Sequence, residues 1–179
     1  VTVNVTDNTP PTLVCPIVVA TVECPTLPNF PAATATDLCD ANPMVSFSDA
    51  TTPGICPQEY TVTRTWTATD ACGNATSCSR TIDVMDNGAP VITCPTVGGT
   101  IECSSLPFFP SATATDACGG TPMVTFTDAT IPGLCPQEFM LTRTWTATDA
   151  CGNTASCSRT INVEDNSAPV LVCPVVVAS

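Results

Sequence analysis

The chain has 179 residues and a net charge of −12, with sixteen acidic side chains, four arginines, no lysine and no histidine. Nucleic acid is a poor partner for a chain this acidic, because phosphate binding needs a basic face. Without histidine, lysine or a Gly-rich phosphate loop, the sequence offers no catalytic base and no nucleotide site. We therefore expect the protein not to be an enzyme.

The first predicted element is a strand within residues 1–8, whose letters VTVNVTDN match INVEDN at 161–166. Residues 7–85 align with residues 86–164 without a gap, at an offset of 79 residues, so the chain is a tandem array. Its expected parts are the last strand of a preceding repeat at 1–8, a first repeat at 9–87, a second repeat at 88–166, and the start of a third, truncated repeat at 167–179.

Six cysteines recur in each repeat, and none of them changes between the two copies. The thirteenth, Cys173, falls at the first cysteine position of the third repeat, so the odd number reflects truncation and not a reactive thiol. Regularly spaced cysteines in so small a unit are typical of disulfides formed in an oxidising, extracellular compartment. Zinc is the alternative, but the chain has no histidine and no CxxC pair.

Short strands are predicted in the first half of the repeat. Eighteen prolines, with threonine and valine between them, argue against long helices. We expect strands at Thr12–Cys15, Val18–Cys24 and Pro43–Asp49, separated by proline-rich connections such as CPTLPNFP.

A β-hairpin is predicted in the second half. Apolar residues alternate with threonine from Tyr60 to Thr69, and a loop through Gly73 and Asn74 precedes a return strand that ends near Val84. Trp66 is then expected to pack in the core against a disulfide. About seven short strands per repeat predict an all-β chain of tandem immunoglobulin-like β-sandwiches, disulfide-rich, with a 79-residue period.

Three segments also carry a family resemblance. DNTPPTLVCP at 7–16, ATATDLC at 33–39 and WTATDACGNATSCSRTIDV at 66–84 resemble the hyalin-repeat (HYR) family of immunoglobulin-like extracellular modules, in the same order and over nearly the whole repeat. The cysteine density is similar to that of repeat arrays in giant tandem-repeat surface proteins and adhesins of Bacteroidota-type bacteria. The resemblance implies a β-sandwich module in an adhesive or structural ectodomain, without identifying a ligand.

Strand alternation assigns each loop to one end of the sandwich. The loops at 33–39 and 70–74 should lie where the linker from the preceding repeat arrives, which we call the upstream pole, and the opposite end is the downstream pole. This geometry favours one disulfide pairing among the many that six cysteines allow. The expected pairs are Cys15–Cys78, Cys24–Cys56 and Cys39–Cys72 in the first repeat, and Cys94–Cys157, Cys103–Cys135 and Cys118–Cys151 in the second.

Acidic residues gather at the same upstream pole. Like charges held close together are costly unless something neutralises them, and calcium binds carboxylate and carbonyl oxygens. One interpretation is a calcium ion at each junction between repeats; the other is that these side chains cap turns through backbone amides. The predicted ligands are Asp7, Asn8, Asp37 and Asp70 and, in the second repeat, Asp86, Asn87, Asp116 and Asp149.

The functional expectation is a structural repeat segment of a secreted cell-surface fibre, stalk or adhesin, stapled by disulfides and stiffened by calcium where it binds. No cofactor is required in this interpretation. The alternatives are a glycan- or protein-binding adhesive module and a self-assembling extracellular filament subunit. Expected partners are neighbouring repeats of the same chain, other copies in a fibre, or a glycan or protein surface, with no nucleic acid and no membrane within this segment.

Overall fold

The structure is a computed structural model that describes residues 1–173. It confirms the predicted fold class, because these residues form strands and no helix. Two compact units are present. The first contains residues 1–89 together with two loops from the second repeat, 116–121 and 149–153. The second contains residues 90–115, 122–148 and the described residues from 154 onward.

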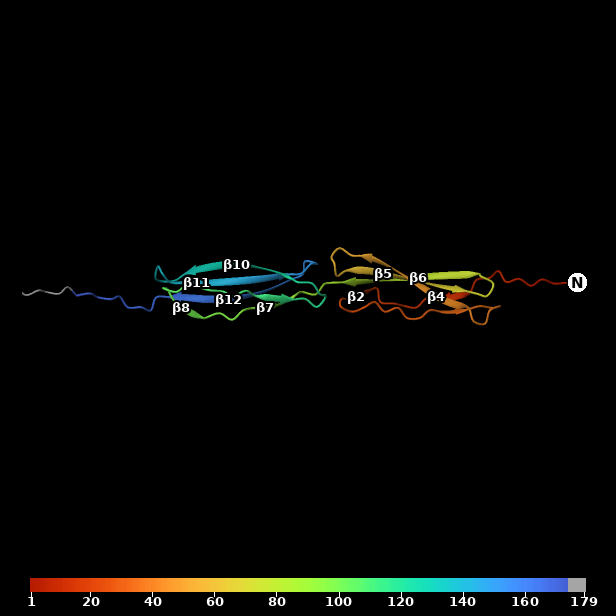
Figure 1. The fold of residues 1–179 in the computed structure, drawn as a ribbon, viewed down its shortest axis with the longest axis horizontal. Coiled ribbons are helices and arrows are strands. Elements are labelled where there is room, and N and C mark those ends of the chain that lie inside the picture. Colours follow the sequence, from red (N-terminus) through yellow and green to blue (C-terminus); the bar gives the residue numbers. More distant parts are fainter. Residues whose placement is uncertain (174–179) are drawn as a thin grey trace, which may run out of the picture. The chain divides into compact units, whose positions relative to one another are not determined.

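The first compact unit is a sandwich of two sheets (Figure 1). The larger sheet has the order β2-β6-β5-β4, in which β2 runs parallel to β6 and the other pairs are antiparallel. The smaller sheet pairs β1 with β3. The strands are β1 (Thr12–Val14), β2 (Thr21–Glu23), β3 (Thr34–Thr36), β4 (Met44–Pro53), β5 (Tyr60–Thr69) and β6 (Ala75–Met85).

Four features of this sandwich differ from the sequence prediction. Strand β2 covers only Thr21–Glu23 of the predicted Val18–Cys24, because only these residues pair with β6. Each repeat has six strands instead of seven. Strand β3 forms in a segment expected to be a loop, because its residues pair with β1. Strand β4 continues to Pro53, four residues beyond the predicted end at Asp49, because its whole length pairs with β5.

The core of the first unit lies on one face of the β5–β6 hairpin. Trp66, Ile82 and Val84 are each no more than 2% exposed. Trp66 lies opposite Cys78 in the strand register, and Cys78 is bonded to Cys15. The tryptophan therefore packs beside a disulfide, as the hairpin pattern predicts, and truncating such a buried ring typically costs about 3 to 5 kcal/mol.

The second compact unit repeats the same topology, with sheets of order β10-β11-β12-β8 and β7-β9. Its core cluster consists of Phe109, Ala112, Trp145, Ile161 and Val163. Its disulfide joins Cys94 to Cys157. The strands are β7 (Val91–Thr93), β8 (Thr100–Glu102), β9 (Thr113–Thr115), β10 (Met123–Pro132), β11 (Phe139–Thr148) and β12 (Thr154–Glu164).

The described residues on either side of the two sandwiches form no strand. Residues 1–8, which the sequence analysis expected to be the last strand of a preceding repeat, are in no strand. Residues 167–173 are also outside any strand, and the rest of the predicted third repeat, 174–179, lies outside the described residues. Residues 1–173 contain no helix that is long and apolar enough to cross a membrane.

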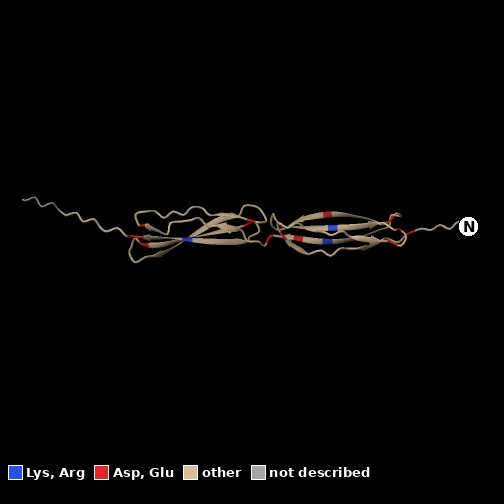
Figure 2. Ribbon diagram, turned by 90° about the horizontal axis from the view of Figure 1, so that it is seen from below, with Lys and Arg blue, Asp and Glu red and all other residues tan. Residues whose placement is uncertain are grey.

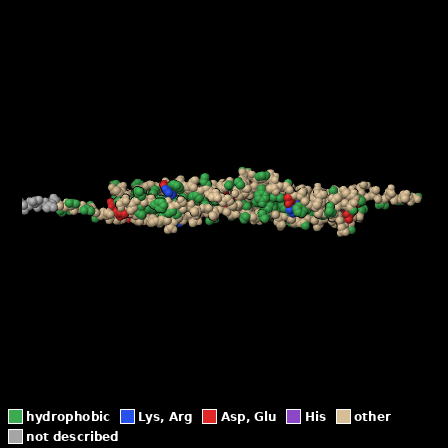
Figure 3. All heavy atoms as spheres, in the orientation of Figure 1, with side chains coloured by type: hydrophobic (Ala, Val, Ile, Leu, Met, Phe, Trp, Pro, Cys, Tyr) green, Lys and Arg blue, Asp and Glu red, His purple; other side chains and the backbone are tan. Residues whose placement is uncertain are grey.

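Each large sheet carries an arginine held between aromatic rings and an aspartate. Arg64 donates two hydrogen bonds of 2.7 Å to the Asp49 carboxylate, and its guanidinium carbon lies 3.9 Å from the centre of the Phe47 ring. The same ion pair recurs between Arg143 and Asp128. Figure 2 shows basic residues part-way along the strands, and Figure 3 shows basic and acidic side chains next to one another among hydrophobic ones.

Replacing Arg64 with lysine is expected to destabilise the first unit by about 0.5 to 1 kcal/mol, because lysine loses the two-point contact with Asp49 and the ring stack. The matched control is Arg80→Lys, since Arg80 donates only to the backbone oxygens of Pro16 and Ser79 and should tolerate the change. Urea unfolding of both variants measures the difference. Equal midpoints would contradict this assignment.

Candidate functional site

The candidate site lies at the downstream pole of the first sandwich, inside the first compact unit. Strand β6 ends at Met85 and passes into the linker that starts with Asp86. Strand β2 ends at this pole because it runs parallel to β6, and the β4–β5 loop lies there because β5 runs antiparallel to β6. The loops 116–121 and 149–153, which we call the junction loops, belong to the same compact unit.

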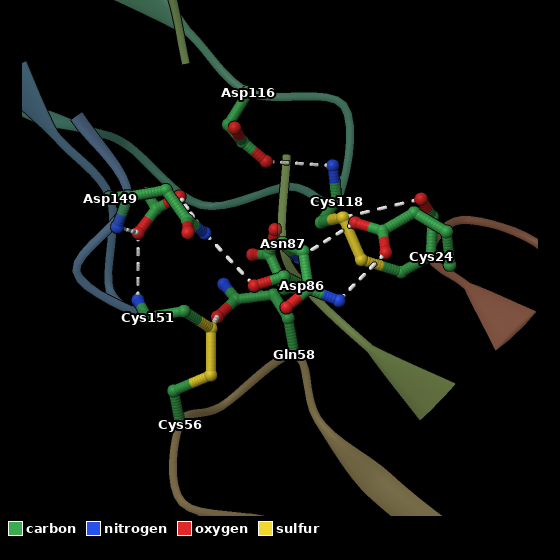
Figure 4. Close-up of a disulfide and its surroundings, with 11 residues drawn as sticks. Cys24, Cys56, Gln58, Asp86, Asn87, Asp116, Cys118, Asp149 and Cys151 are labelled. Atoms are coloured by element: carbon green, nitrogen blue, oxygen red, sulfur yellow. Dashed lines mark hydrogen bonds between the residues drawn. A yellow bond between two sulfur atoms is a disulfide. The ribbon is translucent and has the colours of Figure 1, made fainter. Parts of the chain in front are cut away.

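Two disulfides tie the junction loops to this pole (Figure 4). Cys24, which follows β2, is bonded to Cys118, and Cys56, in the β4–β5 loop, is bonded to Cys151. Their Cα–Cα distances are both 5.1 Å, within the usual range for a disulfide. Each bond therefore joins a residue of the first sequence repeat to a residue of the second.

These bonds correct four of the predicted pairs. Cys24–Cys56 and Cys118–Cys151 are not formed, because all four residues bond across the junction. Cys39–Cys72 and Cys103–Cys135 are not formed either, because all four side chains are free thiols. The pairs Cys15–Cys78 and Cys94–Cys157, which link strands of one sandwich, are present in the structure.

Three of the predicted metal ligands come together beside the disulfides. Asp86, Asp116 and Asp149 each place a carboxylate oxygen within 4.8 Å of the others. Asp86 is 3% exposed, and both of its carboxylate oxygens lack a hydrogen-bond partner. They are the only buried side-chain oxygens or nitrogens without a partner among the described residues.

A buried, unpartnered carboxylate is costly, since it has lost its hydration without gaining hydrogen bonds. Burial raises the pKa of Asp86, and the nearby charges of Asp116 and Asp149 raise it further. The strain at Asp86 is therefore relieved either by protonation of the carboxyl group or by a cation bound to the carboxylate. Asp86 is the strongest indication of a ligand in the first compact unit.

The backbone of each junction loop fixes its own aspartate. Asp149 Oδ1 accepts hydrogen bonds from the amides of Cys151 and Asn153, at 2.9 and 2.8 Å. Burial opposes ionisation of Asp149, but the hydrogen bonds from Asn153 and Cys151 outweigh it, so the pKa of Asp149 is lowered. Asp116 accepts one bond, from the amide of Cys118. Gly152, with φ of 93°, supplies the left-handed conformation that this tight loop requires.

An asparagine attaches the loop to the linker. The Asn153 side-chain amide donates to the Asp86 backbone oxygen at 2.9 Å and to Asp149 Oδ2 at 2.9 Å. Asn153 therefore fixes the position of the Asp149 side chain relative to the linker. The sequence analysis assigned the equivalent Asn74 only a turn-forming role.

Asn87 has a different role from the predicted one. Its backbone and side-chain amides donate to the two carboxylate oxygens of Glu23, at 2.7 and 3.1 Å. These bonds lower the pKa of Glu23 and orient Asn87 toward Glu23. Glu23, which the sequence analysis did not single out, therefore fixes the linker where it leaves the sandwich.

The remaining predicted ligands lie at the upstream pole of the first sandwich. Asp7 and Asp37 come together with the Cys39 thiol, each offering an atom within 4.8 Å of the others. Asp70 caps its hairpin loop by accepting hydrogen bonds from Cys72 and Asn74, which is the turn-capping alternative. Asn8 follows Asp7 directly in the linker, and its side chain is exposed.

Comparisons with known proteins do not assign a family. No family model and no curated protein matches the sequence, so the hyalin-repeat resemblance stays a prediction. Matching solved structures include the protocadherin gamma B4 extracellular domain, at 16% identity and a TM-score of 0.36 over 89% of this chain and 33% of that one. Extracellular cadherin domains 3-6 of protocadherin gamma B2 match at 12% identity and 0.39 over 89% and 52%.

A third match is mouse protocadherin-24, extracellular cadherin domains 1-3, at 9% identity and a TM-score of 0.30 over 61% of this chain and 46% of that one. The chain thus spans between a third and about half of the length of these cadherin structures. Similarities of this size do not make the chain a cadherin.

The Asp86 carboxyl group gives the first unit a specific pH dependence. Because its pKa is raised in the folded chain, its contribution to stability is fully present below the ordinary carboxyl pKa and is lost as pH rises through the raised value. Asp70 and Asp149, with lowered pKa values, contribute stability above the ordinary carboxyl pKa and lose it on further acidification.

With EDTA present, the melting temperature should therefore rise as pH is lowered from neutral toward the ordinary carboxyl pKa of about 4, and should fall on further acidification. The variant Asp86→Asn should lose the rise and keep the fall. Differential scanning calorimetry across this range measures both. A difference between the wild type and Asp86→Asn that does not change with pH above the ordinary carboxyl pKa would exclude a strained carboxylate at Asp86.

Proposed function

We propose that the chain is a structural repeat segment of an extracellular fibre, stalk or adhesin, in which each repeat is fastened to the next. The observation that carries this proposal is the pair of disulfides Cys24–Cys118 and Cys56–Cys151, which connect the two sequence repeats at two separate points. One bond would leave a hinge, whereas two bonds from different strands, together with the linker itself, restrict bending in more than one direction. A structural role needs such restriction, and the disulfides require an oxidising compartment.

Calcium fits the remaining part of the junction. Calcium binds carboxylate oxygens, and the cluster offers Asp86, Asp116 and Asp149, with both oxygens of Asp86 free of other partners. When bound, the ion would supply positive charge that neutralises the three carboxylates and stiffens the linker. With three protein carboxylates, backbone oxygens or water would complete the coordination, and a site with so few charged ligands suits the weak affinities of about 0.1 to 1 mM that extracellular modules use.

Small-angle X-ray scattering of the oxidised chain tests the structural proposal. In calcium we expect scattering that one rigid conformation reproduces, with a maximum dimension that does not change with temperature below unfolding. A variant with serine at all four junction cysteines should need an ensemble of conformations. If the wild-type chain already needs such an ensemble, the segment is a flexible tether and not a stiff one.

A second candidate function is lateral assembly into a filament, and one observation favours it. Strand β4 is an edge strand of ten residues, exposed along its whole length, and it carries the exposed hydrophobic side chains Met44 and Phe47. Such an edge can pair with a strand from another chain. Sedimentation velocity should then show association that increases with concentration and is lost in Ser48→Lys, which places a charge on the edge; a monomer at all concentrations would remove this candidate.

Glycan binding has less support from the same face. The Nε and one terminal nitrogen of Arg64 already donate to Asp49, so the guanidinium is not a free fork for a ligand carboxylate or hydroxyl. Arg64 therefore stabilises the sheet by binding Asp49 on the neighbouring strand.

A further inference from the structure

Both junction disulfides begin in the same loops that present the acidic cluster. Cys118 lies two residues after Asp116, and Cys151 lies two residues after Asp149. In each loop the amide of the cysteine donates to Oδ1 of the aspartate, at 2.8 and 2.9 Å (Figure 4). The position of each cysteine therefore sets the position of the aspartate beside it.

The first of these disulfides also lies next to the buried linker carboxylate. The amide of Cys24 donates at 3.0 Å to the backbone oxygen of Met85, the residue before Asp86. Both sulfur atoms of the Cys24–Cys118 bond lie within 4.8 Å of a carboxylate oxygen of Asp86 and of one of Glu23. This disulfide and the unpartnered carboxylate of Asp86 are therefore parts of one small group of side chains.

The two closed disulfides hold the carboxylates of the cluster together. Asp86, Asp116 and Asp149 come from three separate segments, and their charges repel one another. Without a cation this repulsion opposes the disulfides, because opening either bond lets one loop carry its aspartate away. With a cation bound, the same proximity is favourable, since the ligands are already gathered before the ion arrives. The effect of the cluster on the disulfides therefore changes sign when an ion binds.

We propose that calcium binding and the two junction disulfides are reciprocally coupled, so that calcium protects both bonds from reduction and their reduction releases calcium. This inference rests on the calcium site of the proposed function and adds the regulation of that site. Two changes that favour the same arrangement of the loops must favour each other to the same degree. A reducing environment and a loss of calcium therefore each promote opening of the junction.

Reduction of each bond by a dithiol transfers two electrons. One thiolate of dithiothreitol attacks a sulfur of the protein disulfide, forms a mixed disulfide and releases one cysteine thiolate. The second thiolate of the reductant closes a ring on the attached sulfur and releases the other cysteine. Dithiothreitol becomes a cyclic disulfide, and its two protons end on the two cysteine thiols. Calcium also weakens the repulsion between the carboxylates and the attacking thiolate, which changes the rate, so the equilibrium reports the coupling.

The test is a redox equilibrium of the full chain. Samples are equilibrated with mixtures of reduced and oxidised dithiothreitol, either in EDTA or in about 10 mM calcium. After an acid quench and alkylation of the thiols, mass spectrometry of peptic peptides gives the oxidised fraction of each bond. Serine replaces the free cysteines in every sample, so that only the disulfides exchange; these are Cys39, Cys72, Cys103, Cys135 and Cys173.

Calcium is expected to raise the ratio of reduced to oxidised dithiothreitol at half-reduction by about 10- to 100-fold for both junction disulfides. This range corresponds to an ion at ten to about one hundred times its Kd that is released on reduction. The internal control is Cys94–Cys157, which joins two segments of the second compact unit and whose ratio should not change. In Asp86→Asn the calcium effect should be lost, and in EDTA both junction bonds should resist reduction more strongly, since the repulsion is smaller.

Isothermal titration calorimetry of calcium into the oxidised chain separates the possible failures. If calcium binds and the half-reduction ratio of the junction disulfides stays the same, the coupling is overturned while the calcium site stands. If no calcium binds, the coupling is overturned together with the calcium part of the proposed function, and the scattering test of the junction disulfides is unaffected. An equal change for all the disulfides also overturns the coupling, because calcium would then act on the whole fold.

Discussion

A chain in which serine replaces Cys24, Cys56, Cys118 and Cys151 is expected to melt about 10 °C or more below the wild type. The two lost bonds span 94 and 95 residues of sequence. Closing a loop of this length lowers the entropy of the unfolded chain enough to contribute about 4 to 5 kcal/mol for the first bond. The second bond adds less than the first, since the first already brings its ends closer together. For a chain of this size each kcal/mol corresponds to about 2 to 4 °C.

The chain supplies a matched control for this experiment. Serine at Cys39, Cys72, Cys103 and Cys135 makes the same four chemical changes at equivalent repeat positions, but these residues are free thiols. The control should melt within about 2 °C of the wild type, since it loses no bond. Calorimetry of the two quadruple variants under the same oxidised conditions gives the comparison. Equal melting temperatures would show that the junction bonds do not stabilise the fold.

Adding calcium to the EDTA-treated, oxidised chain is expected to raise its melting temperature by about 3 to 10 °C. A ligand present at ten to one hundred times its Kd stabilises by about 1.4 to 2.7 kcal/mol, and about 10 mM calcium reaches this range for a site of extracellular affinity. The response should come from Asp86, the member of the cluster whose oxygens have no partner.

The variant Asp86→Asn distinguishes calcium binding from a general effect of charge, because we expect opposite changes in its melting temperature, relative to the wild type, in EDTA and in calcium. In EDTA it should melt higher than the wild type, since a strained buried charge is gone. In calcium it should lose most of the increase. Asp165→Asn is the matched control, because Asp165 holds the same repeat position but is exposed, and it should keep the wild-type response. If Asp86→Asn keeps the full calcium response, the ion is bound elsewhere or not at all.

Local sequence patterns predicted most of the sandwich. Alternation of threonine with apolar residues from Tyr60 to Thr69 identified β5. The return strand that ends near Val84 identified β6, and Ile82 and Val84 lie on its buried face as predicted. The short strand β3 was missed because three residues carry too little alternation to mark a strand, and its pairing with β1 decides its structure. Tertiary pairing also extended β4 past Asp49.

The candidate site could be placed from the sequence only as far as its poles. Strand alternation put Cys24 and Cys56 at one end of the repeat, but it could not tell whether they bond to each other or across the linker. Both pairings satisfy the same topology, and only the observed Cα separations decide between them. The short linker, with few residues between β6 and β7, was the available signal that the next repeat's loops come within reach.

Burial of the linker aspartate distinguishes the two acidic poles, and the sequence does not carry that information. Asp70 and Asp149 hold the same hairpin position and make the same capping bonds, yet Asp149 lies beside the buried Asp86, whereas Asp7 at the equivalent position is only half-buried. Asn87 was predicted to be a ligand because it follows Asp86, but Glu23 accepts both of its amides.

The proposed function requires the junction disulfides to limit movement of the second repeat relative to the first, and pulsed electron spin resonance tests this requirement most directly. Spin labels carried by unnatural amino acids at Ser48 and Thr127, exposed and equivalent positions on β4 and β10, report the distance between the repeats without using thiols. The account predicts one narrow distance distribution in the oxidised chain with calcium, and a broad one when serine replaces the four junction cysteines. A distribution in the oxidised wild type as broad as that of the variant would contradict it.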